Sequence, residues 1–119
     1  MSQFGIDYSS EESVAVSTLD QFCEDSGLYP VVIKFDIEGA ELRALKGGRR
    51  VLANAKVVQF EFGGTNIDSR TYFRDFFQFF TEMGFKLYRL GPNGLMLVTL
   101  AREEDEVFRV TNYFAYKAK

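Results

Sequence analysis

Residues 31–41 read Val-Val-Ile-Lys-Phe-Asp-Ile-Glu-Gly-Ala-Glu. The first five form a nearly continuous apolar run rich in β-branched residues, which is typical of a strand covered on both faces, as in a parallel sheet. Two acids and Gly39 follow the run, and from Ala40 the apolar residues recur with a helical period. This stretch therefore predicts a strand, a short polar loop and a helix, the basic unit of an α/β protein.

Strand and helix patterns alternate on either side of this unit. A Thr18-x-x-Gln21 capping pattern predicts that a helix starts at Thr18 and ends at Gly27. Cys23 lies on the apolar face of that helix and is predicted to be a core residue. The other expected elements are a possible strand at 14–16, a helix at 40–54, a strand at 57–62, a helix from Asp68 or Ser69 to about 83, and a hairpin of residues 85–90 and 95–100 around Gly-Pro-Asn-Gly.

This order of elements predicts a single α/β domain with a partial Rossmann-like, class I methyltransferase-type architecture. We expect three layers and a mostly parallel sheet that ends in an antiparallel hairpin. Residues 1–13 are interpreted as a mobile arm and residues 14–119 as the domain. Residues 103–106 are expected to begin a short helix before an aromatic tail at 113–116. The pair Gly47-Gly48 indicates either close approach of the helix to the sheet or a break in the helix.

The composition of the 119 residues excludes several classes of function. A net charge of −3 gives no support to nucleic-acid binding, and the absence of histidine excludes Ser–His catalysis and His-ligated zinc. No apolar run approaches the roughly 20 residues of a membrane span. The only cysteine gives no reason to assume an oxidising compartment. We therefore expect a cytoplasmic protein with no metal site and no nucleic-acid or membrane partner.

Polar side chains follow both expected parallel strands. Asp36 and Glu38 come after the first strand, Glu61 lies near the end of the second, and Asn66 belongs to the Gly63-Gly64-Thr65-Asn66 loop. Ligands of open α/β sheets bind at the carboxyl ends of the strands. If the two strands are neighbours, Asp36 and Glu61 share one edge, where a carboxylate pair could bind hydroxyls, hold a cation or accept a proton.

A purely structural reading of the same residues stays open. Glu38 could simply favour the positive end of the helix dipole, and Glu61 could have a polar partner inside the strand. Neither a Gly-x-Gly-x-x-Gly turn after a strand nor a Walker A lysine loop is present.

The phrase at 33–41, together with Leu45-Lys46-Gly47, resembles the K-x-D-[VI]-E-G-A-E…L-K-G signature of the FkbM family. These are S-adenosylmethionine-dependent methyltransferases that act mostly on oxygen atoms of sugars and natural products. Thr18-Leu19-Asp20 is similar to a family motif upstream, and residues 59–66 and 68–72 resemble a segment of one subgroup, as does the ending Phe108…Thr111-Asn112-Tyr113. The resemblance extends over about residues 14–116.

This resemblance is to the C-terminal half of the family's seven-stranded sheet only. It implies S-adenosylmethionine as the cofactor, Asp36 and Glu38 as cofactor-binding residues, and Asp36 and Glu61 as catalytic residues. Glu61 and Asn66 would then bind a small-molecule or sugar hydroxyl acceptor. The family's Gly-rich cofactor turn and the acid of its second strand have no counterpart here. We therefore expect an O-methyltransferase domain with an incomplete cofactor site or, alternatively, a non-catalytic association module or inactive fragment.

The resemblance also bears on assembly. In the family's sheet the fourth strand lies beside the first, which has no counterpart in this sequence, so residues 31–35 would form an apolar edge strand. We expect a homodimer in which the two edges pair or are covered. Alternatively, the strand at 14–16 folds back onto the edge and leaves a monomer.

Overall fold

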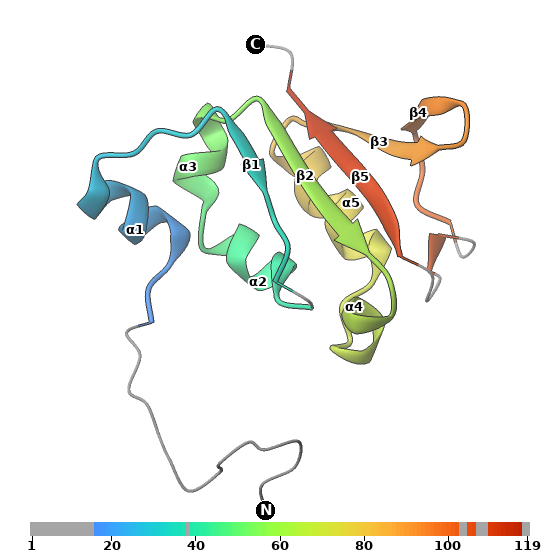
Figure 1. The fold of residues 1–119 in the computed structure, drawn as a ribbon, viewed down its shortest axis with the longest axis horizontal. Coiled ribbons are helices and arrows are strands. Elements are labelled where there is room, and N and C mark those ends of the chain that lie inside the picture. Colours follow the sequence, from blue (N-terminus) through green and yellow to red (C-terminus); the bar gives the residue numbers. More distant parts are fainter. Residues whose placement is uncertain (1–15, 38, 103–104, 107–109, 118–119) are drawn as a thin grey trace, which may run out of the picture.

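The computed structural model describes residues 16–117 except 38, 103–104 and 107–109. The arm at 1–13 and most of the possible strand at 14–16 lie outside the described residues. The elements follow in the order α1 (Leu19–Ser26), β1 (Val32–Lys34), α2 (Glu41–Lys46), α3 (Arg49–Asn54), β2 (Val57–Phe62), α4 (Gly64–Asp68), α5 (Phe73–Glu82), β3 (Lys86–Gly91), β4 (Gly94–Val98) and β5 (Thr111–Tyr116) (Figure 1). None of these helices is long and apolar enough to cross a bilayer.

The five strands form one mixed sheet in the order β1-β2-β5-β3-β4. Only β1 and β2 pair in parallel, whereas the other three neighbouring pairs are antiparallel. The expectation of a mostly parallel sheet is therefore wrong. The cause is β5, the aromatic tail, which inserts between β2 and β3 and runs against both. Because of this insertion, β3 has the direction of β1 and β2 but does not touch them.

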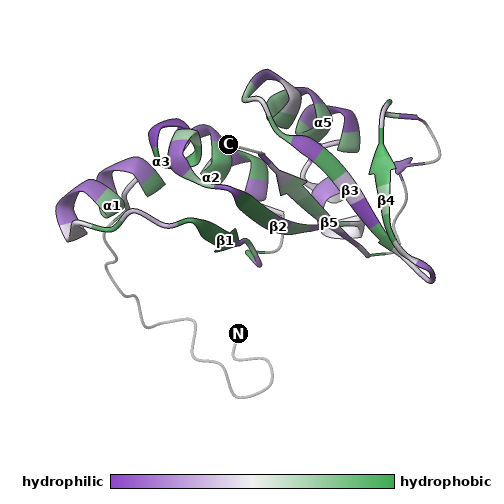
Figure 2. Cartoon of the chain, turned by 90° about the horizontal axis from the view of Figure 1, so that it is seen from above, coloured by the Kyte–Doolittle hydropathy of each residue, from purple (hydrophilic) through white to green (hydrophobic). Residues whose placement is uncertain are grey.

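Helices α1, α2, α3 and α5 lie on one face of the sheet (Figure 2). Strand β2 reflects this, since Val58, Phe60 and Phe62 are fully buried towards the helices. Its other residues, Val57, Gln59 and Glu61, are only half-buried on the opposite face. The predicted third layer is thus missing from the part of the chain that the structure describes. The first strand is likewise covered on one face only, because Val32 is 66% exposed.

Aromatic rings fill the space between the sheet and α5. Phe60 of β2 stacks on Phe76 with ring centroids 4.8 Å apart and on Phe80 at 5.3 Å. Tyr113 of β5 also stacks on Phe60, with ring centroids 5.5 Å apart, so the C-terminal strand is part of the core. Each stacked pair adds about 0.5–1.5 kcal/mol to the gain from apolar burial. The apolar stripe of α5 packs against the sheet as predicted, although the helix starts at Phe73 and the short helix α4 precedes it.

The glycine pair breaks the predicted helix at 40–54 into α2 and α3. A Cβ atom on Gly48 would lie 2.7 Å from Cδ2 of Leu19, so the close approach is to α1 and not to the sheet. The carboxylate of Asp20 in α1 accepts the backbone N–H groups of Arg50 at 3.1 Å and Val51 at 2.8 Å. One helix therefore caps the start of another.

This contact yields a prediction on stability. Asp20→Ala removes the acceptor of both N–H groups and is expected to lower the free energy of unfolding by about 1–2 kcal/mol. Urea unfolding followed by circular dichroism measures the loss. Asp25→Ala, which replaces an exposed acid of the same helix, is the matched control and should stay within about 0.5 kcal/mol of the parent. Equal losses in the two variants would contradict a capping role for Asp20.

Candidate functional site

The parallel register of β1 and β2 brings two predicted site residues to one edge of the sheet. Val32 pairs with Val57 and Lys34 with Gln59, and the N–H of Phe35 still donates to the carbonyl of Gln59 at 2.8 Å. Extending this register by two residues aligns Asp36 with Glu61. Side chains alternate along a strand, so both acids belong to the face that the helices leave bare.

The two acids differ in their surroundings. Asp36 is exposed beyond the end of β1, whereas Glu61 is half-buried within β2. Glu38 lies outside the described residues, so its predicted place beside Asp36 stays a prediction.

The loops after β1 and β2 are joined by a buried side-chain pair. Glu41 at the start of α2 is 3% exposed and Asn66 of α4 is 2% exposed. The Asn66 amide donates from Nδ2 to Oε1 of Glu41 at 3.0 Å, and its Oδ1 accepts the N–H of Gly63 at 3.0 Å. Both ends of the Asn66 amide are therefore engaged inside the protein.

The Glu41 carboxylate also closes the loop that carries Asp36. Its Oε1 accepts the N–H of Gly39 at 3.0 Å and its Oε2 accepts the N–H of Ile37 at 3.3 Å. Gly39 has φ 98°, and a Cβ atom there would lie 2.8 Å from Oγ of Ser69. Only glycine fits this conformation and this close approach. Gly39 and Glu41 thus fix how the loop after β1 packs against the segment after β2.

Glu41 is the residue that sequence reasoning missed. It was visible as the last letter of the 33–41 phrase, but an acid at a helix start is ordinarily explained by the helix dipole. Asn66 was predicted to bind substrate. In the structure its amide oxygen and nitrogen are both hydrogen-bonded within the protein, to Gly63 and Glu41. A role for Asn66 towards a ligand stays a prediction.

A small cavity of about 160 Å³ lies beside Glu61. Its lining residues are Glu41, Glu61, Gly63, Thr65, Asn66 and Val110. The carboxylate of Glu41 is already hydrogen-bonded, so Glu61 is the acid most available to a bound group. A hydroxyl-bearing fragment suits this size and polarity.

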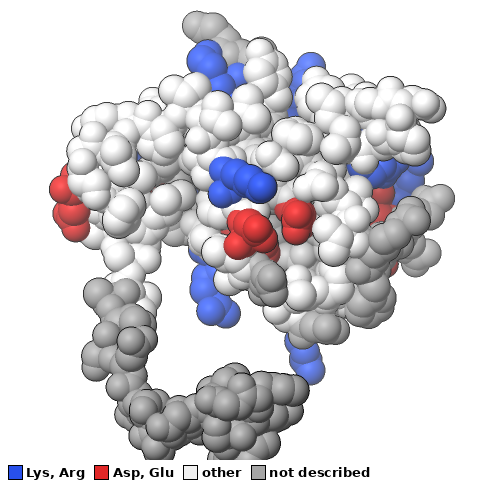
Figure 3. Space-filling view, in the orientation of Figure 1, with Lys and Arg blue, Asp and Glu red and all other residues white. Residues whose placement is uncertain are grey.

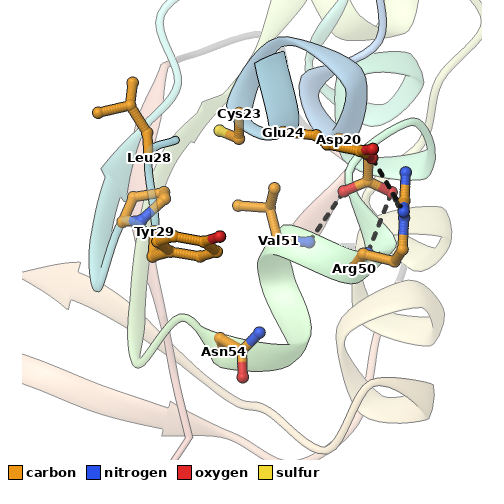
Figure 4. Close-up of a pocket in the computed structure, with 9 residues that line it drawn as sticks. Asp20, Cys23, Glu24, Leu28, Tyr29, Arg50, Val51 and Asn54 are labelled. Atoms are coloured by element: carbon orange, nitrogen blue, oxygen red, sulfur yellow. Dashed lines mark hydrogen bonds and ion pairs between the residues drawn. The ribbon is translucent and has the colours of Figure 1, made fainter. Parts of the chain in front are cut away.

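A larger hollow of about 280 Å³ lies between α1, α3 and the segment that precedes β1 (Figure 4). Its polar edge is occupied by Asp20, which binds the N–H of Val51 and the side chain of Arg50. Leu28 and Tyr29 form its apolar side. The hollow sits at the amino end of β1, away from Asp36, and gathers none of the predicted site residues. Among the described residues, no group of three or more acids and cysteines could hold a metal ion.

The fold and the site together define an α/β protein with carboxylates and a small polar cavity at the carboxyl edge of its parallel strand pair. The sequence profile of the methyltransferase FkbM domain matches residues 2–87, which is more than half of the chain. The protein therefore belongs to the FkbM methyltransferase family. Neither a curated protein nor a solved structure matches it.

The cavity at the carboxyl edge is smaller than a pocket for S-adenosylmethionine, the cofactor that the resemblance implies, would be. The cavity at the edge has about 160 Å³, well below the roughly 300 Å³ at which pockets for such ligands begin. A complete cofactor site would need further residues beyond those described.

The Glu41–Asn66 pair allows a test by a double-mutant cycle. Glu41→Ala leaves the N–H groups of Ile37 and Gly39 and the Asn66 amide without their acceptor, so we expect a loss of about 2–4 kcal/mol in unfolding free energy. Asn66→Ala should cost less, and the double variant should cost less than the sum by about 1 kcal/mol or more. Urea unfolding of the four proteins measures the coupling. Glu24→Ala, which breaks an exposed ion pair with Arg50, serves as control and should change little. Strict additivity would show that the pair does not act as a unit.

Proposed function

We propose that this chain supplies the acceptor side of an S-adenosylmethionine-dependent O-methyltransferase. The observation that supports the proposal is the register of β1 on β2, which extended by two residues aligns Asp36 with Glu61, together with a cavity of about 160 Å³ that Glu61 lines. Family membership supports methyl transfer as the reaction class. The acceptor we propose is a hydroxyl of a small molecule or sugar.

The two acids have distinct proposed roles. A hydroxyl oxygen that accepts a methyl group must lose its proton, and a carboxylate within hydrogen-bond reach can take it. Glu61 lines the cavity and is proposed to hold the acceptor hydroxyl and accept this proton. Asp36 is proposed to orient the reacting groups from the open side of the edge, and Glu41 with Asn66 positions the loops around both.

The cofactor role proposed for Asp36 and Glu38 depends on residues beyond those described, because the cavity is too small by itself. A cytoplasmic location is part of the proposal and is supported by the lone cysteine, Cys23, which is buried in the structure as predicted. The alternative function is a non-catalytic association module. Exposed apolar side chains on the sheet face that the helices leave bare, such as Val32, favour that alternative.

Cofactor binding can be measured directly. We expect isothermal titration of the 119-residue chain with S-adenosylmethionine to give no binding or a dissociation constant in the millimolar range, because the edge cavity is too small. A micromolar constant would contradict this and would indicate a cofactor site that the described residues do not reveal.

The catalytic proposal is tested by grafting. Residues 14–119 would replace the corresponding half of an active FkbM enzyme, and transfer of radiolabelled methyl from S-adenosylmethionine to acceptor hydroxyls would be measured. Asp36→Asn and Glu61→Gln should each lower the rate at least 100-fold. Asp36→Asn should also keep the melting temperature within a few degrees, because the side chain is exposed.

Asp25→Asn, an exposed acid on α1, is the matched control and should keep the rate. A folded graft that binds the cofactor but transfers no methyl to any hydroxyl would favour the association module. Full activity of both edge variants would reject the assigned roles.

A further inference from the structure

A second cavity, of about 200 Å³, neighbours the one at Glu61. The hydroxyl of Ser69, which lines the second cavity, donates to the carbonyl of Thr65 at 2.8 Å, and Thr65 lines the first. We call the second one the arginine cavity. Its lining residues are Gly39, Ala40, Arg43, Ser69 and Thr71.

Backbone contacts hold the arginine cavity in shape. Gly39 has φ 98° and approaches so closely that a Cβ atom there would lie 2.8 Å from Oγ of Ser69. Thr71 donates its backbone N–H to the carbonyl of Asn66 at 2.8 Å, and the Asn66 amide is bonded to Glu41. The buried Glu41–Asn66 pair therefore supports both sides of this cavity as well.

The arginine cavity offers hydrogen-bond donors that have no acceptor in the part of the chain that the structure describes. Arg43 is exposed on α2, and none of the ion pairs found between described residues involves it. The hydroxyl of Thr71 likewise has no described partner, whereas that of Ser69 already donates to Thr65. A guanidinium carries five N–H donors and a permanent positive charge. This combination of donors and charge suits an anion.

Arg70 adds a second guanidinium at the same place. It lies between Ser69 and Thr71 in the chain, so its Cα atom is about 3.8 Å from that of each of these lining residues. Its φ is 59°, and among the described residues no other non-glycine has a positive φ. Backbone strain of this kind gathers at ligand-binding sites. In the space-filling view, basic side chains at the lower edge of the molecule, near α2 and α4, lie apart from the acidic side chains near its centre (Figure 3).

We propose that the arginine cavity binds a phosphate group carried by a small molecule. Guanidinium groups form short, charge-assisted hydrogen bonds with phosphate oxygens. The two positive charges of Arg43 and Arg70 match the charge of a phosphate monoester, which is close to −2 at neutral pH. The Thr71 hydroxyl donates to a further oxygen. The proposal makes no assumption about methyl transfer.

The volume of the arginine cavity agrees with this ligand. About 200 Å³ admits a phosphate group together with part of the molecule that carries it. A carboxylate would use one guanidinium fork and carry half the charge, so the second arginine would add little to its binding.

The experiment is a titration of the full, ¹⁵N-labelled chain with inorganic phosphate and with glycerol 3-phosphate at constant ionic strength, followed by two-dimensional NMR. We expect the amide signals of Gly39, Ser69 and Thr71 to move and to saturate by about 10 mM of either probe, as a dissociation constant near 1 mM requires. The ester should bind at least as tightly as inorganic phosphate, and acetate at least tenfold more weakly.

Three variants test the donors. Arg43→Gln should weaken phosphate binding at least tenfold, and Thr71→Val should weaken it about threefold. Arg70→Asn removes the charge but keeps a residue type that tolerates the left-handed conformation, and it should also weaken binding about threefold. Lys56→Gln is the matched control, because it removes one positive charge from an exposed residue at the amino end of β2. It should leave the affinity unchanged, and circular dichroism checks that each variant is folded.

Several results would overturn the proposal. Amide signals that stay in place with both probes would mean that the cavity is not an anion site. Equal weakening by Arg43→Gln and Lys56→Gln would reduce the effect to net charge, and parent-like binding by Arg43→Gln would move the site elsewhere. Acetate bound as tightly as phosphate would reject the phosphate class, and inorganic phosphate bound without the ester would reject a small-molecule carrier.

Discussion

The hydrogen bond from the Asn66 amide to the Glu41 carboxylate is the contact on which the site depends. It joins the start of α2, the helix after β1, to α4, the helix after β2, across 25 residues of chain. A carboxylate buried this deeply is costly unless its oxygens are hydrogen-bonded, and here both are: Oε2 accepts the N–H of Ile37, and Oε1 accepts the N–H of Gly39 and the Asn66 amide. No buried side-chain nitrogen or oxygen lacks a partner among the described residues. This polar network therefore fixes the loop that follows Asp36 and the turn from β2 into α4.

The sheet separates two kinds of surface. Its helix side is a dense aromatic core in which Phe60 contacts rings from α5 and from β5, and this core provides most of the apolar burial. Its opposite face presents both apolar side chains, such as Val57, and polar ones, such as Gln59 and Glu61. The small cavity lies at the carboxyl edge of that face, beside Glu61.

The match over residues 2–87 shows membership of the FkbM methyltransferase family. The geometry adds that Glu61 and the hydrogen-bonded Glu41 line a cavity of about 160 Å³, smaller than the roughly 300 Å³ at which small-molecule pockets begin. Methyl transfer, its cofactor and its acceptor therefore belong to the proposed function.

Local patterns of the sequence by themselves determined much of this protein. Thr18 as the cap of α1, the strands around Ile33 and Phe60, and the β3–β4 hairpin were predictable, because each depends on residues within a few positions of one another. The phrase at 33–41 likewise placed Asp36 at a strand end and indicated the family.

Tertiary structure alone decided the rest, because those features depend on contacts between distant segments. β5 enters the middle of the sheet since its aromatic face completes the core around Phe60, and no local pattern encodes which strands it will separate. The helix breaks at Gly48, where the backbone lies so close to Leu19 of α1 that a side chain would not fit. Among the acids of residues 36–41, Glu41 is buried, and its partner Asn66 is brought to it only by the folded chain.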